Sequence, residues 1–145
     1  MKVDGQEWDV KLTPETIEPH SFSAATFESR NLIVIDGTQP VSRQDENAFH
    51  EMVHLASWVA PEEIVHDIGI RLYGMLRDLG ILAEGQLIDV LNPSMATAEE
   101  MKKINESAAA MMGRKVKSHV SEVTWDGNQG RFTDEQWRQS CLINP

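Results

Sequence analysis

Two stretches of helical periodicity, separated by only a few residues, constrain the fold of this chain more than any other feature. Apolar residues recur at helical spacing in residues 42–59 and again, on a broader face, in residues 64–79. Ser42 is the expected N-cap of the first helix, Pro61 suits the start of the second, and Gly80 ends it. Helices joined by so short a link predict an antiparallel helical hairpin.

Strand patterns precede this hairpin. Alternate residues are apolar in residues 6–12, which predicts a half-buried strand. Residues 23–36 read as a second strand, with a continuous apolar run at 32–35 that stops at a turn. We expect the two segments to pair in a small antiparallel sheet, which together with the helices makes an α+β fold.

The chain after the hairpin is mostly helical in pattern. Residues 81–92 fit either a strand or a short helix. From about residue 97 to residue 119 the pattern is helical, and Thr97 with Glu100 is typical of a capping box at its start. Residues 133–142 predict a last short helix.

Charge divides the chain at a turn near residue 92. The net charge of −10 falls entirely within residues 1–92, whereas residues 93–145 hold equal numbers of acidic and basic side chains. We therefore expect a core of residues 1–92 and a helical C-terminal extension of residues 93–145 packed on it. Trp125 and Trp137 are the side chains expected to hold the extension on the core.

Composition excludes several classes of protein. A net charge of −10 argues against a basic face that binds nucleic acid. The single cysteine, Cys141, excludes an internal disulfide and paired-cysteine zinc sites. No apolar run approaches the roughly 20 residues that span a bilayer, and the first ten residues lack an apolar signal core. We expect a cytoplasmic protein with neither nucleic acid nor membrane as partner.

The first helical stretch contains the motif HExxH, as His50-Glu51-Met52-Val53-His54. Residues four apart lie on one helical face, so the two imidazoles can bind one Zn²⁺ at about 2.0–2.1 Å. Zinc lowers the pKa of a bound water to about 7, and Glu51 is placed to take the proton of that water. The motif predicts a zinc site with His50 and His54 as ligands and Glu51 as general base. The alternative is a pair of solvated surface histidines.

A zinc site needs a third protein ligand, and the start of the second helix offers four candidates. These are Glu62, Glu63, His66 and Asp67. At 100° per residue, Glu62 lies closer than Glu63 to the centre of the apolar face, so Glu62 is the preferred ligand and Glu63 the alternate. Antiparallel pairing about Pro61 would instead bring His66 or Asp67 level with the second histidine.

The stretch from Phe49 to Asp78 resembles the small zincin-like metallopeptidases of phages and mobile elements, which are distant relatives of the ImmA/IrrE family. The resemblance covers about residues 20–80, and HExxH is its specific motif. It implies a strand before the motif helix, here Asn31–Asp36, with His50 and His54 as zinc ligands.

The same resemblance implies that Glu51 is the base and that Glu62, which is followed by x-Ile-Val, is the third ligand. A gluzincin-like Glu-xxx-Asp spacing would instead select Glu63 with Asp67.

These observations predict a minimal zincin-like domain: a small antiparallel sheet on the HExxH helix, a glutamate helix, and the C-terminal extension. The expected function is zinc-dependent hydrolysis of peptide bonds in a peptide or protein substrate, with the oligomeric state left open. The alternative is a non-catalytic, phage-type interaction module with a structural or vestigial zinc site. Glu51 favours the enzyme, because a structural site needs no base. The acidic charge disfavours another zinc hydrolase, such as a nuclease.

Three further features have both a functional and a structural interpretation. Tyr73 is either a hydrogen-bond donor to an oxyanion or a half-buried helix residue. The strand Asn31–Asp36 would bind an extended peptide if it lay at a sheet edge. Cys141 is either a thiolate that blocks the zinc site or a small apolar residue.

Overall fold

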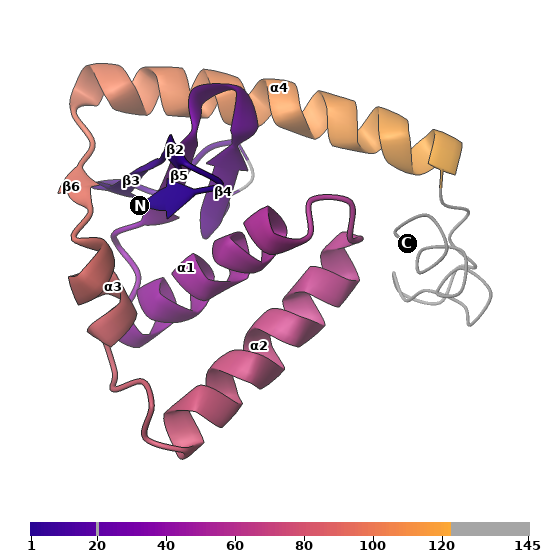
Figure 1. Cartoon of the computed structure of the whole chain (residues 1–145). Coiled ribbons are helices and arrows are strands. Elements are labelled where there is room, and N and C mark those ends of the chain that lie inside the picture. The colour runs from indigo at the N-terminus through magenta and orange to yellow at the C-terminus, as the bar shows by residue number, and fades with distance from the viewer. Residues whose placement is uncertain (20, 123–145) are drawn as a thin grey trace.

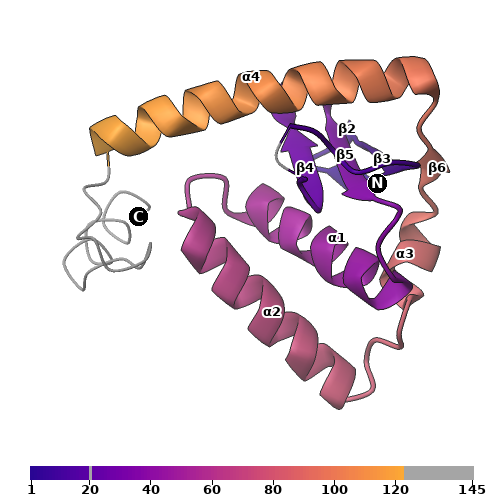
Figure 2. The same ribbon diagram turned by 180° about the vertical axis from the view of Figure 1, so that it is seen from behind.

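The computed structural model describes residues 1–19 and 21–122, with side chains as far as residue 111, and has an α+β fold (Figure 1). The sheet lies between α4 on one face and α1 on the other, and α2 packs on the outer side of α1 (Figures 1 and 2). The elements are β1 (Lys2–Val3), β2 (Gln6–Glu7), β3 (Asp9–Thr13), β4 (Ala24–Phe27), β5 (Leu32–Asp36), α1 (Val41–Ala56), α2 (Glu62–Asp78), α3 (Gln86–Leu91), β6 (Ser94–Met95) and α4 (Ala98–Glu122).

The main sheet has the strand order β4-β5-β3-β6 and is mixed. β5 and β6 both run parallel to β3, and only β4 pairs antiparallel, with β5. The expected antiparallel pairing of the first two strand segments is therefore wrong. The reason is the path of residues 14–31: the chain first runs back down the sheet as β4, so β5 enters from the same end as β3.

The predicted single strand over residues 23–36 is in fact the two strands β4 and β5. A 3-10 turn over Glu28–Arg30 separates them, and Asn31 ends it in the left-handed conformation with a φ of 47°. Asparagine tolerates this conformation better than most residues, which allows the chain to reverse there. The hairpin places Ala25 of β4 opposite Val34 of β5.

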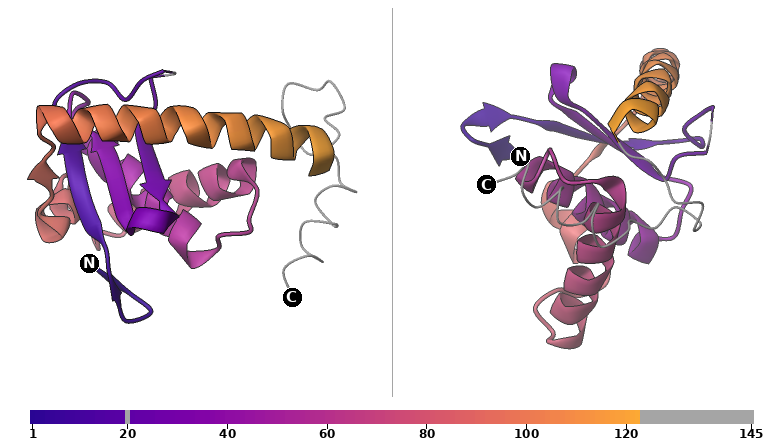
Figure 3. Two further views of the ribbon diagram at one scale, coloured as in Figure 1. Left: turned by 90° about the horizontal axis from the view of Figure 1, so that it is seen from above. Right: turned by 90° about the vertical axis from the view of Figure 1, so that its right-hand side faces the viewer.

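β5 is buried on both faces, which explains its uninterrupted apolar run. Val34 is fully buried under α4, in a cluster with Ile104 and Ala108. Ile33 and Ile35 point to the other face and pack in a cluster with Ala48 of α1. Figure 3 shows the same sandwich, with α4 on the side of the sheet opposite α1 and α2. The helix with the HExxH motif thus rests on a rigid, buried strand.

The helical hairpin is confirmed, with small differences at its helix ends. α1 begins at Val41 with Pro40 at the N-cap, so the expectation of a Ser42 N-cap is wrong. Proline has a fixed φ, and the Pro40 carbonyl already accepts hydrogen bonds from the first turn. Pro61 is likewise the N-cap of α2, one residue outside it, and Gly80 follows the end of α2 with a φ of 73°.

Within residues 81–92 the chain forms the short helix α3 rather than a strand. The predicted long helix is confirmed as α4, and its capping box is present. The Glu100 N–H donates to Thr97 Oγ1 at 3.2 Å, and the Thr97 N–H donates to Glu100 Oε1 at 3.1 Å. The predicted helix at 133–142 lies outside the described residues. The same holds for Trp125, Trp137 and Cys141. No helix in the described part of the chain is long and apolar enough to cross a membrane.

Candidate metal centre

His50 and His54 project from the same side of α1 toward the first turn of α2. Their ring centroids are 4.8 Å apart, and both side chains are half-buried. His50 Nε2 lies 2.9 Å from Glu62 Oε1, and His54 Nε2 lies 2.9 Å from Glu62 Oε2. One atom from each of the three side chains falls within 4.8 Å of the others. The structure thus brings together two imidazole nitrogens and one carboxylate at the closed end of the hairpin.

These three side chains could hold a metal ion. Two histidine nitrogens and a carboxylate oxygen match the donor set of catalytic zinc sites, in which a fourth position stays open for water or substrate. Glu62 is 46% exposed at its side chain, so the site faces solvent on the α2 side. The donor set therefore fits zinc in chemistry and in accessibility.

Of the four candidates for a third ligand, Glu62 is the one that the structure places with the histidine pair. Pro61 caps α2, so Glu62 is its first residue and sits beside the end of α1. Glu63 is not in the group, and its Oε2 is buried without a hydrogen-bond partner. His66 contacts His50 by its ring only, while Asp67 pairs with Arg71 on the exposed side of α2 at 3.8 Å. The ligand role of Glu62 stays a prediction.

Glu51 lies on the sheet side of the two histidines, and its side chain is almost completely buried. Thr26 Oγ1, from β4, donates a hydrogen bond to Glu51 Oε2 at 2.5 Å. Burial raises the pKa of Glu51 above its usual value, against the opposing effects of the Thr26 hydrogen bond and the nearby His54 and His50. A buried carboxylate with a raised pKa stands beside the three convergent side chains.

Thr26 is a site residue that the sequence analysis missed. It stands between apolar neighbours in β4, so the sequence around it is that of an ordinary strand. Its contact with Glu51 depends on how β4 lies along α1, and no local signal encodes that arrangement.

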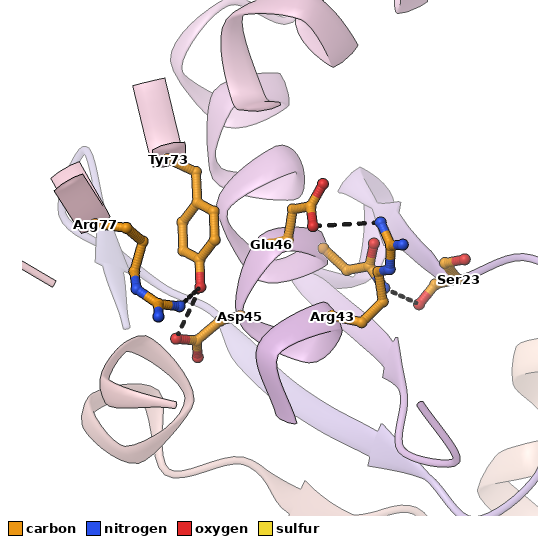
Figure 4. A network of polar contacts seen from close by, with 7 residues as sticks. Ser23, Arg43, Asp45, Glu46, Tyr73 and Arg77 are labelled. Atoms are coloured by element: carbon orange, nitrogen blue, oxygen red, sulfur yellow. Dashed lines mark hydrogen bonds and ion pairs between the residues drawn. The ribbon is translucent and has the colours of Figure 1, made fainter. Parts of the chain in front are cut away.

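A cleft of about 350 Å³ adjoins His50. Its walls come from α1, α2 and the residues that flank β4 and β5, and they include Ser23, Gln39, Arg43, Asn47, His66 and Ile70. Arg43 pairs with Glu46 at 3.3 Å, as Figure 4 shows, and the Asn47 side chain donates to the Ser23 carbonyl at 3.5 Å. Polar groups thus line the approach to the candidate metal centre.

Tyr73 belongs to a different polar network, at the other end of the hairpin (Figure 4). Its hydroxyl donates to Asp45 Oδ2 at 3.4 Å and accepts from Arg77 at 3.1 Å. The other carboxylate oxygen of the fully buried Asp45 accepts the Ile88 N–H of α3 at 2.9 Å. Burial is the main reason that the pKa of Tyr73 is raised. This network joins α1, α2 and α3, which favours the structural interpretation of Tyr73.

The strand Asn31–Asp36 does not lie at a sheet edge. β5 lies between β4 and β3, so the condition under which this segment would bind a peptide is not met. Within the described residues the outer strand beside α1 is β4, which carries Thr26.

Comparisons of the chain with protein-family models, with curated proteins and with solved structures found no match. The interpretation as a zincin therefore rests on the residues of the chain itself and on their arrangement.

Proposed function

We propose that this protein is a zinc-dependent metallopeptidase that hydrolyses peptide bonds. The observation that carries the proposal is the convergence of His50, His54 and Glu62 with the buried carboxylate of Glu51 beside them. A site that served only to stabilise the fold would gain nothing from a fourth side chain whose buried carboxylate is costly to desolvate.

His50, His54 and Glu62 would hold the metal. When bound, zinc polarises a scissile carbonyl and makes a water molecule acidic near neutral pH. In this proposal Glu51 accepts the proton of the attacking water as the water oxygen bonds to the carbonyl carbon. Glu51 then donates that proton to the amine nitrogen as the carbon–nitrogen bond breaks. Burial supports this role, because a raised pKa lets Glu51 hold the proton between the two steps.

The substrate in this proposal is a peptide in extended conformation. β4 is the outer strand on this side of the described sheet, and Thr26 within it already contacts Glu51. An extended peptide that paired with the outer edge of β4 would pass over the candidate site, and main-chain hydrogen bonds would position it. The adjoining cleft then receives one of the flanking side chains.

Cleavage of a peptide mixture tests this function. The zinc-loaded protein and its Glu51→Gln variant are each incubated with a proteome-derived peptide library, and new termini are identified by mass spectrometry. We expect new termini with the wild type and none with the variant, because an amide cannot take the proton. His50→Ala/His54→Ala serves as the metal-free control. Identical termini from all three proteins, or none from the wild type, would contradict the proposal.

The second candidate function is a non-catalytic interaction module, and one surface favours it. α2 carries four large apolar side chains at helical spacing that are all exposed, from 39% to 73%: Ile68, Leu72, Met75 and Leu79. An apolar helix stripe of this kind is typical of protein contact surfaces. The same experiment separates the two candidates, since a non-catalytic module would produce no new termini.

A further inference from the structure

We propose that His66 is a further catalytic residue, which donates a hydrogen bond to the carbonyl oxygen of the peptide bond being cleaved. This inference rests on the proposed function and adds a group that the HExxH motif does not supply. It also replaces Tyr73 in that role, because the Tyr73 hydroxyl is engaged by Asp45 and Arg77.

The position of His66 follows from the geometry of α2. It lies one turn after Glu62, on the side of the helix that faces α1 near His50. The ring centroids of His50 and His66 are 5.8 Å apart, with 65° between the ring planes. Both imidazoles line the same cleft of about 350 Å³. His66 thus lies in the cleft beside one member of the convergent group.

His66 is also available for hydrogen bonding. It is exposed, and its ring makes no hydrogen bond or ion pair with another described residue. Three other side chains of the cleft already have partners: Arg43 pairs with Glu46, the Asn47 amide donates to the Ser23 carbonyl, and the Gln39 amide donates to Asp36. His66 is therefore an imidazole of the cleft that neither belongs to the convergent group nor stabilises a neighbouring element.

The chemistry of peptide hydrolysis needs such a donor. Negative charge develops on the carbonyl oxygen as water adds to the carbon, and a hydrogen-bond donor fixed beside that oxygen stabilises the charge. A neutral imidazole carries one N–H and can donate without any change in its protonation. His66 transfers no proton in this role, because it only donates a hydrogen bond. Removal of one such donor typically lowers kcat by about 10²–10³-fold.

Three variants test the assignment in the zinc-loaded protein. His66→Ala is expected to lower kcat about 10²-fold while KM and zinc affinity stay within threefold of the wild type. His66→Gln retains a neutral N–H donor, and its kcat is expected to be at least tenfold higher than that of His66→Ala. Arg71→Ala, on the exposed side of the same helix and outside the cleft, is the matched control and is expected to leave kcat unchanged. An unchanged kcat in His66→Ala, or a parallel loss of zinc, would overturn the proposal.

A binding measurement separates this proposal from the proposed function. The probe is a phosphinic dipeptide analogue of Ala-Ala, whose tetrahedral anion resembles the charge distribution during hydrolysis. By calorimetry, His66→Ala is expected to bind it at least tenfold more weakly than the wild type does, whereas Arg71→Ala binds it as tightly as the wild type. If the wild type cleaves no peptide, the proposed function fails and this titration still decides on His66. Equal binding by His66→Ala and the wild type would refute the donor.

Discussion

The hydroxyl of Thr26 on β4 donates a hydrogen bond to the buried carboxylate of Glu51 on α1. This contact joins the outer strand of the sheet to the residue that we propose as general base. A hydrogen bond to a buried charged group is among the stronger side-chain interactions, because the carboxylate would otherwise be desolvated without compensation. The strand that would receive substrate and the carboxylate that would act on it are therefore held in one arrangement.

Thr26→Val removes this hydrogen bond at nearly constant side-chain volume. We expect the free energy of unfolding to fall by about 1–3 kcal/mol at neutral pH, because Glu51 loses its donor while it stays buried. Thr26→Ser keeps the hydroxyl and should lose much less. Urea unfolding monitored by circular dichroism compares the three proteins. Equal stability of the valine variant and the wild type would show that the contact contributes nothing.

Glu62→Gln and Glu63→Gln form a matched pair for the third ligand. Glu62 lies with the two histidines, whereas Glu63, the next residue, does not. Loss of a residue that only hydrogen-bonds to a ligand typically costs about 10–100-fold in metal affinity. We expect Glu62→Gln to lower zinc affinity by more than this. The zinc affinity of Glu63→Gln should stay near that of the wild type. Titration against a competing chelator measures both. A larger loss in Glu63→Gln would assign the ligand to Glu63 instead.

The HExxH motif, the helical hairpin and the Thr97–Glu100 capping box are local patterns, and for that reason the sequence alone predicts them. The pairing of β3 with β5 is not local. It depends on the course of the chain after β3, where the pattern predicts one strand over residues 23–36 but the chain forms β4, a turn and β5. The parallel register, and with it the contact of Thr26 with Glu51, therefore follows from tertiary structure.

The third ligand marks the limit of the same reasoning within a helix. If the predicted start of α2 is wrong by one residue, the predicted direction of each side chain changes by about 100°. That change is enough to exchange Glu62 for Glu63. The position of Pro61 at the N-cap removes that uncertainty and places Glu62 beside His54. The contact of Tyr73 with Asp45 is likewise tertiary, since it depends on how α1, α2 and α3 pack together.

Tyr73→Phe tests whether Tyr73 is structural. The change removes one hydroxyl that links Asp45 to Arg77, while the ring stays packed. We expect the free energy of unfolding to fall by about 1 kcal/mol, the usual net contribution of such a hydrogen bond, and the rate of peptide cleavage to stay unchanged. A loss of kcat without a loss of stability would return Tyr73 to the active site.

The pairing of Lys11 with Glu100 predicts a pH dependence of stability. Lys11 lies 2.8 Å from Glu100 and, together with the Thr97 N–H, lowers the pKa of Glu100 from 4.5 to about 2. The folded state thus favours the charged carboxylate, so this contribution is complete above pH 4.5 and is lost as the pH falls toward 2. Glu100→Gln should be less stable than the wild type at pH 7, and the difference should shrink below pH 4.5. A difference that is constant with pH would contradict this pairing.

The central claim is that His50, His54 and Glu62 hold a zinc ion beside Glu51. An anomalous difference map, recorded at the zinc absorption edge from crystals grown with equimolar zinc, tests it most directly. We predict one peak per chain, with two histidine nitrogens and an oxygen of Glu62 at about 2.0–2.2 Å and a fourth position open on the side of Glu51. A zinc peak held by other residues, or no peak between α1 and α2, would contradict the claim.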